Sequence, residues 1–435
     1  MKVALDTNLS LRQSVIYQVY NRNHNHTGTF RELIYDLKRI KELGVDIVYL
    51  LPIHPIGKKD KKGSLGCPYS IQDYREVNPE YGTLEDFKDL IKVTHEHGMK
   101  LMIDVVYNHT SRDSVLLKTH PEWFYKNDEG EFANRIGDWS DVTDLDYTKD
   151  VALWDELIDI LKYWAALGVD GYRCDVASFI PINFWIKARS EVAKINPDFI
   201  WLAESVDGGF IKGVRSLGYE VCSDSELYQA FDICYDYDVY CYFKDYLLGK
   251  SPLDEYVKRV QLQEYIYPGN YVKLRCLENH DQTRIASLVQ SKEQLNMWTA
   301  FNYLQKGATM IYAGQEAGCQ HQPSLFDVDK VDWSQYNEAG MADLMKQLAI
   351  IKKDPVMSEG YYEIELGTVS DTVYLSYESS VKQRLAIFNF SLKAGDLFID
   401  VADGLYKNLL TQQDVIVKNK TVTLSNEPII FDINK

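Results

Sequence analysis

The segment Lys100-Leu-Met-Ile-Asp-Val-Val-Tyr-Asn-His109 shows the pattern on which the fold prediction depends. Residues 100–106 are apolar apart from Lys100 and Asp104, as in a strand that is buried on both faces, and polar residues follow. The preceding residues predict a helix that begins at Thr83, carries apolar side chains at helical spacing and ends at Gly98. A helix followed by a buried strand is one repeat of a parallel α/β fold.

The same alternation extends in both directions along the chain. Strands alternating with helices predict right-handed βαβ units and a parallel sheet. About eight such units over residues 14–353 favour a closed (β/α)8 TIM barrel. No G-x-G-x-x-G motif follows a strand, which weakens a dinucleotide-binding sheet as the alternative. The predicted strands are residues 14–20, 46–51, 100–106, 172–176, 199–203, 219–223, 271–277 and 308–312.

Two segments break this alternation. Residues 107–150 lack helical periodicity and contain turn formers, which predicts a domain inserted after the third strand. Residues 354–435 change to a period of two and predict a C-terminal antiparallel β-sandwich domain. We therefore expect a catalytic barrel made of residues 1–106 and 151–353, an inserted domain at 107–150 and a β domain at 354–435.

The composition restricts partners and compartment. The 435 residues carry 64 Asp and Glu against 47 Lys and Arg, a net charge of −17. This argues against nucleic acid and anionic membranes as partners, because both select clustered basic residues. The sequence contains no run of about 18 apolar residues, so it predicts no membrane span. The N-terminal residues do not resemble a signal peptide. The seven scattered Cys are typical of free thiols. We expect a cytoplasmic protein, and the oligomeric state stays open.

Tyrosine is abundant, with 31 residues, and it can fill a core or present a half-polar surface to a ligand. A dense group between Tyr228 and Tyr246 is interpreted as core and helix packing. The acids interleaved with this group, Asp232, Asp236 and Asp238, are interpreted as solvated or as anchors of loops.

Polar residues terminate or follow several of the predicted barrel strands. The carboxyl ends of all eight strands meet at one face of such a barrel, where active sites lie. A single buried carboxylate indicates a structural ion pair, because its burial is costly without a partner. Several that converge on one face predict an active site. The candidates are Asp104, Asn108, His109, Arg173, Asp175, Glu204, His280 and Asp281.

Asp175 and Glu204 fit the chemistry of glycoside hydrolysis. A retaining enzyme needs two carboxyl groups about 5–5.5 Å apart, one ionised as nucleophile and one protonated as acid. Arg173, two residues before Asp175, is expected to keep Asp175 ionised. The apolar residues before Glu204 are expected to raise its pKa toward the value that a general acid needs.

The other strand-end residues support this chemistry or suggest an alternative. Asp281 would stabilise the transition state or bind sugar hydroxyls, and His109 and His280 would donate hydrogen bonds to hydroxyls. The alternative is a catalytic metal, which needs about three protein ligands around an open position. Its candidate ligands would be His109, His280, Asp104 and Asp281. The His-x-His pair at residues 24 and 26 lies beyond the first strand and has no obvious set of further ligands, so we favour glycoside chemistry.

The sequence resembles the α-amylase family of glycoside hydrolases. Each motif alone is weak, but the set occurs in the family's order and spans a barrel, a domain B inserted after the third strand and a C-terminal β domain. The main motifs are residues 104–109 (DVVYNH), 171–175 (GYRCD), 203–205 (AES) and 278–281 (ENHD). Subsidiary similarities lie at residues 44–55, 68–74, 143–146 and 311–316.

The resemblance implies a role for each of these residues. Asp175 would be the nucleophile, Glu204 the acid/base and Asp281 the stabiliser of the transition state. Arg173, His109 and His280 would support the sugar at the cleaved bond, and Tyr69 would stack on it.

The resemblance implies no required cofactor and leaves a calcium site open. Calcium-dependent members often carry Lys-His soon after the nucleophile, where this chain has Ser178-Phe179. Asn108 retains one of the calcium ligands.

The activity implied by the resemblance is that of a retaining hydrolase of α-1,4-glucosidic bonds, with starch-derived glucans or maltodextrins as substrates. One alternative is an α-1,6-glucosidase or 4-α-glucanotransferase of the same family, because these enzymes share the motifs. A second alternative is a catalytically inactive, glucan-binding relative. The presence of all three carboxylates counts against an inactive protein.

Overall fold

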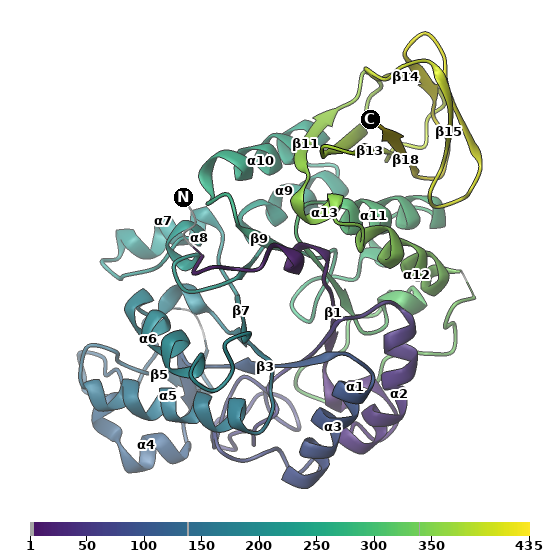
Figure 1. The fold of residues 1–435 in the computed structure, drawn as a ribbon. Helices are drawn as coiled ribbons and strands as arrows, with labels where there is room; N and C mark the ends of the chain where they lie inside the picture. The colour runs from purple at the N-terminus through teal and green to yellow at the C-terminus, as the bar shows by residue number, and fades with distance from the viewer. Residues whose placement is uncertain (1–3, 137–138, 339) are drawn as a thin grey trace.

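A computed structural model describes residues 4–136, 139–338 and 340–435. Its centre is a closed barrel of parallel strands, as predicted (Figure 1). Each barrel strand pairs with the next one along the chain, and the last pairs with the first. The strands are β1 (Val15–Val19), β2 (Ile47–Leu50), β3 (Lys100–Val105), β6 (Gly171–Cys174), β7 (Ile200–Ala203), β8 (Ile233–Tyr235), β9 (Val272–Arg275) and β10 (Ala308–Tyr312).

Helices surround the barrel and cover its outer face (Figure 1). The α3 helix begins as predicted: the Thr83 hydroxyl accepts a hydrogen bond from the Asp86 backbone, and the Asp86 carboxylate accepts one from the Thr83 backbone. The longer helices are α2 (Phe30–Glu42), α3 (Leu84–Glu96), α5 (Val151–Ala166), α6 (Ile182–Val192), α7 (Gly208–Ser216), α9 (Tyr237–Leu247), α10 (Leu253–Ile266), α11 (Lys292–Leu304) and α12 (Met341–Lys352).

The barrel strands are short and buried, apart from the half-buried Lys100 at the start of β3. Every residue of β1, β6 and β7 is buried, which explains why the sequence shows apolar runs rather than alternation. Cys174 of β6 lies in register with Ala203 of β7. The next residue on each strand, Asp175 and Glu204, therefore leaves the barrel at the same level on neighbouring strands.

The sixth barrel strand is not the predicted run at residues 219–223. It is β8 (Ile233–Tyr235), and residues 219–223 form an irregular connection before α8 (Asp224–Leu227). β8 has only three residues and lies between Asp232 and Asp236, so no apolar run marks it in the sequence. The interpretation of these two acids as solvated is also wrong, because both are buried and paired, with Arg189 and Arg275 respectively.

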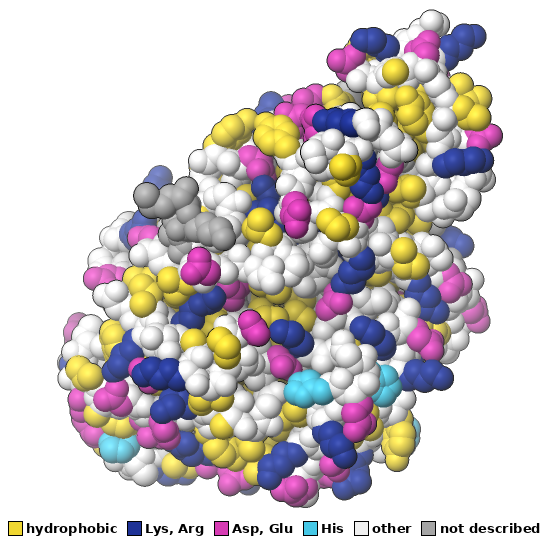
Figure 2. Space-filling model, viewed as in Figure 1, with side chains coloured by type: hydrophobic (Ala, Val, Ile, Leu, Met, Phe, Trp, Pro, Cys, Tyr) yellow, Lys and Arg dark blue, Asp and Glu magenta, His cyan; other side chains and the backbone are white. Residues whose placement is uncertain are grey.

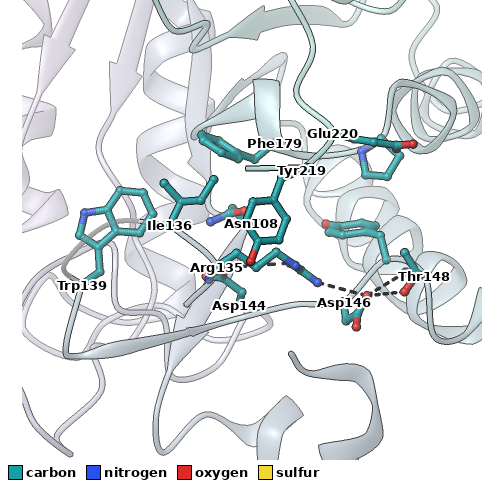
Figure 3. Close-up of a pocket in the computed structure, with 13 residues that line it drawn as sticks. Asn108, Arg135, Ile136, Trp139, Asp144, Asp146, Thr148, Phe179, Tyr219 and Glu220 are labelled. Carbon is teal, nitrogen blue, oxygen red and sulfur yellow. Dashed lines mark hydrogen bonds and ion pairs between the residues drawn. The ribbon is translucent and has the colours of Figure 1, made fainter. Parts of the chain in front are cut away.

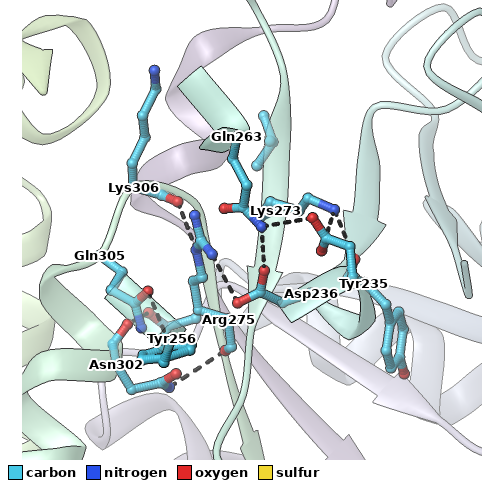
Figure 4. A network of polar contacts seen from close by, with 12 residues as sticks. Tyr235, Asp236, Tyr256, Gln263, Lys273, Arg275, Asn302, Gln305 and Lys306 are labelled. Atoms are coloured by element: carbon cyan, nitrogen blue, oxygen red, sulfur yellow. Dashed lines mark hydrogen bonds and ion pairs between the residues drawn. The ribbon is translucent and has the colours of Figure 1, made fainter. Parts of the chain in front are cut away.

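A buried ionic network joins β8 and β9 to the flanking helices (Figure 4). Arg275 of β9 is fully buried, and its Nη1 lies 2.7 Å from Oδ2 of Asp236. Lys273 of the same strand is also fully buried and contacts the carboxylates of Asp224 and Asp238. Each cation compensates carboxylates that would be costly to bury alone.

Four smaller sheets lie outside the barrel in the described residues, one between β3 and β6 and three in the C-terminal part. After β3, β4 (His109–Ser111) pairs with β5 (Val142–Asp144) in antiparallel order, beside α4 (Val115–Thr119). The C-terminal residues form a four-stranded antiparallel sheet in the order β11, β12, β13, β18, with an apolar cluster that includes two further strand pairs. Its strands are β11 (Tyr361–Leu366), β12 (Thr372–Glu378), β13 (Lys382–Asn389) and β18 (Ile429–Asn434); the pairs are β14 (Asp396–Phe398) with β17 (Thr421–Thr423) and β15 (Gly404–Lys407) with β16 (Asp414–Val417).

Two features of the described residues bear on possible partners: the length and hydropathy of the helices, and the distribution of charge on the face in Figure 2. In the ranges that the structure describes, no helix is both long and apolar enough to cross a membrane. On the face in Figure 2, Lys and Arg side chains are interspersed with Asp and Glu. All seven cysteines are free thiols.

We expect the network in Figure 4 to be essential for stability. Arg275→Met leaves the Asp236 carboxylate buried without its cation, so the free energy of unfolding in urea should fall by about 3–5 kcal/mol. The double variant Arg275→Met/Asp236→Asn should lose less, because no charge is left unpaired. Lys258→Met, which removes an exposed cation from α10, is the control and should unfold like the wild type. A single Arg275→Met variant as stable as that control would contradict the role of the network.

Candidate active site

A cavity of about 350 Å³ lies where the carboxyl ends of the barrel strands meet. It collects side chains from β4, from the residues after β2, β6, β7 and β9, and from the loop after β10. Arg173, the remaining predicted site residue, contacts Asp175 and Glu204. The structure thus brings together all seven residues that the sequence predicts as catalytic or substrate-binding. The six that line the cavity are Tyr69, His109, Asp175, Glu204, His280 and Asp281.

Arg173 of β6 is fully buried and contacts three carboxylates. Its Nη1 lies 2.9 Å from Oδ1 of Asp104 and 2.9 Å from Oδ1 of Asp175. Its Nη2 lies 2.7 Å from Oε1 of Glu204. One cation therefore faces three acids in a desolvated site, and complete ionisation would leave two uncompensated negative charges. This arrangement favours a group of carboxyls that retains a proton.

Burial raises the pKa of both Asp175 and Glu204. For Asp175, repulsion from Glu204 raises the pKa further, and attraction to Arg173 opposes both effects. The predicted upward shift of Glu204 is confirmed. That Arg173 keeps Asp175 ionised stays a prediction: the guanidinium lowers the pKa of Asp175, while burial and the neighbouring carboxyl raise it. Two such close carboxyls titrate as a pair, with apparent pKa values that belong to both.

The backbone between the two carboxyls is strained. Val176, directly after Asp175, has φ 42° and ψ 42°, in the left-handed region that a β-branched residue rarely adopts. In this conformation the Val176 N–H donates a 2.8 Å hydrogen bond to Oε2 of Glu204. Such strain is retained only where the surrounding structure enforces it, and here it fixes Glu204 beside Asp175.

Tyr69, His280 and Asp281 form a second hydrogen-bonded group in the cavity. Tyr69 stacks on His280 with ring centroids 5.3 Å apart, and its hydroxyl lies 2.7 Å from Nε2 of His280. The Gln18 amide nitrogen lies 3.0 Å from Nδ1 of His280 and donates to it, so the neutral ring carries its proton on Nε2. Nε2 lies 3.0 Å from Oδ2 of Asp281. Burial raises the pKa of Asp281, but the facing imidazole outweighs it and the net shift is downward.

His109 and three residues that the sequence did not indicate form another wall of the cavity. Burial lowers the pKa of His109 to about 4, so its imidazole is neutral near pH 7. Its ring lies against that of Trp139, with centroids 5.3 Å apart. Asp141 is buried and pairs with Lys62 at 3.1 Å. Trp139, Asp141 and Lys62 lie in irregular segments rather than at barrel strand ends, so strand periodicity gives no signal for them.

Asn108 lines a second cavity, of about 310 Å³, whose walls include Phe179, Pro181 and residues 218–220 (Figure 3). Two of the carboxylates that line this cavity already have partners: Nη2 of Arg135 lies 3.1 Å from Oδ1 of Asp146, and the Arg135 backbone N–H donates to Oδ2 of Asp144 at 2.7 Å. Within the described ranges, no group of three or more His, Cys, Asp or Glu is arranged to hold a metal. Because Arg135 engages both Asp144 and Asp146, the residues around Asn108 do not fit a calcium ion.

Family models match nearly the whole chain. The model described as "Alpha amylase, catalytic domain" matches residues 17–122 and 117–383. The model described as "Bacterial Alpha amylase C-terminal domain" matches residues 363–431.

Solved structures resemble the chain over its length. An alpha-amylase from Lactobacillus plantarum is 45% identical, covers 98% of this chain and 100% of its own, and superposes with a TM-score of 0.94. A noncanonic maltogenic alpha-amylase from Thermotoga neapolitana is 32% identical with the same two coverages and a TM-score of 0.88.

Two curated relatives are less identical to the chain than these structures. Alpha-amylase 2 of Dictyoglomus thermophilum is 24% identical over 407 residues, which is 88% of this chain and 67% of that protein. An alpha-1,4-glucan:maltose-1-phosphate maltosyltransferase of Picrophilus torridus is 28% identical over 274 residues, or 59% of this chain. The match spans only 40% of that transferase.

Proposed function

Since the chain belongs to the α-amylase family of glycoside hydrolases and transferases, we propose that it is a retaining hydrolase of α-1,4-glucosidic bonds in starch-derived glucans or maltodextrins. The observation that supports this most is the placement of Asp175 and Glu204 on neighbouring strands, around one guanidinium. Neighbouring strands lie about 4.8 Å apart. This spacing is close to the 5–5.5 Å or so between the carboxyls of retaining enzymes.

In the first step, an Asp175 carboxylate oxygen attacks C1 of the sugar. Glu204 gives its proton to the glycosidic oxygen, so the bond between C1 and that oxygen breaks and a glycosyl ester forms on Asp175. The shared proton of the pair supplies the two states required, a carboxylate and a carboxylic acid. Arg173 stabilises the carboxylate through its 2.9 Å hydrogen bond to Oδ1 of Asp175.

In the second step, the Glu204 carboxylate takes a proton from water, whose oxygen attacks C1. The bond between C1 and Asp175 breaks, and both carboxyls return to their starting states. Two inversions at C1 retain the α configuration. The ionised Asp281 would stabilise positive charge that develops on the sugar ring in both steps.

The remaining residues would bind the sugar. The imidazoles of His109 and His280 would donate N–H groups to hydroxyls, and Tyr69 would present its ring to the sugar face. The acidic surface agrees with an uncharged polymer as substrate rather than a polyanion.

A glucanotransferase is the second candidate, because the relatives include maltosyltransferases. It would form the same ester on Asp175 and differ in the acceptor, a sugar hydroxyl in place of water. Mass spectrometry of the products from maltoheptaose separates the two: only shorter products indicate a hydrolase, and longer products indicate transfer. Cleavage of isomaltose instead would indicate an α-1,6-glucosidase.

Substitution of either carboxyl tests the assignment. Asp175→Asn should lower kcat on a chromogenic maltooligosaccharide at least about 10³-fold, because it removes the nucleophile, and Glu204→Gln should do so because it removes the proton donor. Asp150→Asn, a conservative change at the exposed N-cap of α5, is the matched control and should turn over normally. Near wild-type turnover by either site variant would refute the proposed mechanism.

The pair should also determine the pH profile of kcat/KM. Burial raises both pKa values, so the acid limb, where the pair must lose its first proton, should lie above the ordinary carboxyl value of about 4. The alkaline limb reports loss of the second proton. With α-maltosyl fluoride, whose leaving group needs no acid, Glu204→Gln should keep the acid limb and lose the alkaline one. Persistence of the alkaline limb in this variant would assign it to another residue.

A further inference from the structure

We propose that the Arg135 guanidinium is a fixed internal cation within the segment between β3 and β6, and that this protein therefore needs no calcium ion there. The residues around Asn108 do not fit calcium, and the structure shows what stands in its place. This inference is independent of the hydrolytic activity proposed above.

The guanidinium lies among oxygen atoms of β5 and the residues after it (Figure 3). Its Nη1 donates a 2.9 Å hydrogen bond to the Leu145 carbonyl and lies 4.0 Å from Oδ2 of Asp144. Its Nη2 lies 3.1 Å from Oδ1 of Asp146. The group also lies over the Tyr125 ring, 4.8 Å from the centroid, which restricts its position. One side chain thus bonds a carbonyl, lies 3.1 Å from one carboxylate and faces a second at 4.0 Å.

Burial makes this cation necessary. The side chains of Asp144 and Asp146 are only 4% and 8% exposed. Two carboxylates in such a position need a compensating positive charge. Lys149 also faces Asp146, but it lies 3.8 Å away and is 57% exposed, so solvent screens its contribution. Arg135 is the better buried of the two cations and the one that contacts both acids.

An arginine and a calcium ion cannot share this position. Calcium takes six to eight oxygen ligands at about 2.3–2.6 Å, drawn from carboxylates, carbonyls and water. Here the oxygens of Leu145 and Asp146 bond the guanidinium, and Asp144 accepts from Asn134 and from the Arg135 backbone. Arginine stays charged at every accessible pH, so this compensation is permanent.

The guanidinium also positions one wall of the candidate active site. Asp144 pairs with His109 in the register of β5 and β4, and the Asn108 carbonyl accepts a hydrogen bond from the Leu145 backbone. Arg135 thus anchors the strand that holds His109 at the cavity. It is a positioning residue, since it touches neither Asp175 nor Glu204.

Hydrogen exchange with and without calcium tests this assignment. In the wild-type protein, exchange of peptides that cover residues 109–111 and 142–146 should be the same in EDTA and in millimolar CaCl2. Arg135→Ala should speed exchange of both peptides about tenfold, because the two acids lose their shared partner. Arg135→Lys should restore part of the protection, since it keeps the charge but not the fork of donors.

Lys149→Ala is the matched control, because it removes the other cation that faces Asp146. It should exchange like the wild type. Either of two results would overturn the proposal: faster exchange of the wild-type peptides in EDTA than in CaCl2, or unchanged exchange in Arg135→Ala.

Discussion

One buried guanidinium, that of Arg173, holds three carboxyl groups together at the end of the barrel. Asp104, Asp175 and Glu204 come from three adjacent strands, and their burial side by side would be prohibitive without a shared cation. Burial also raises the pKa of Asp175 and of Glu204, which favours a proton on that pair. The contacts of Arg173 thus allow the carboxyls to be buried together while the Asp175–Glu204 pair retains a proton. Acid catalysis of glycoside cleavage requires such a proton.

Much of this arrangement could be predicted from the sequence, because barrel strands that are buried on both faces leave apolar runs. Asp175 and Glu204 are visible as polar residues that end such runs. β8 could not be predicted because the buried Asp232 and Asp236 flank its three residues and leave no apolar run. Each acid pairs with an arginine far away in the sequence, so the neighbouring residues do not indicate that it is buried. The left-handed backbone of Val176 is likewise invisible, since only tertiary contacts enforce it.

In the segment between β3 and β6, a single arginine likewise compensates buried carboxylates. Arg135 compensates Asp144 and Asp146 as Arg173 compensates the catalytic candidates, and in both places a guanidinium can bond several oxygens in fixed directions. Asn108 suggested a calcium site from its motif alone. The motif around Asn108 gave no indication of Arg135. This residue lies outside the motif, and only the fold of its loop places it against the residues of β5 and after it.

Trapping of the glycosyl-enzyme tests the central claim most directly. The protein is incubated with a 5-fluoro-α-maltosyl fluoride, which forms the ester faster than water cleaves it, and its mass and peptides are measured. The account predicts one added glycosyl group on the peptide that carries Asp175, and none on the Asp175→Asn variant. An adduct on another residue, or none while the fluoride is turned over, would contradict it.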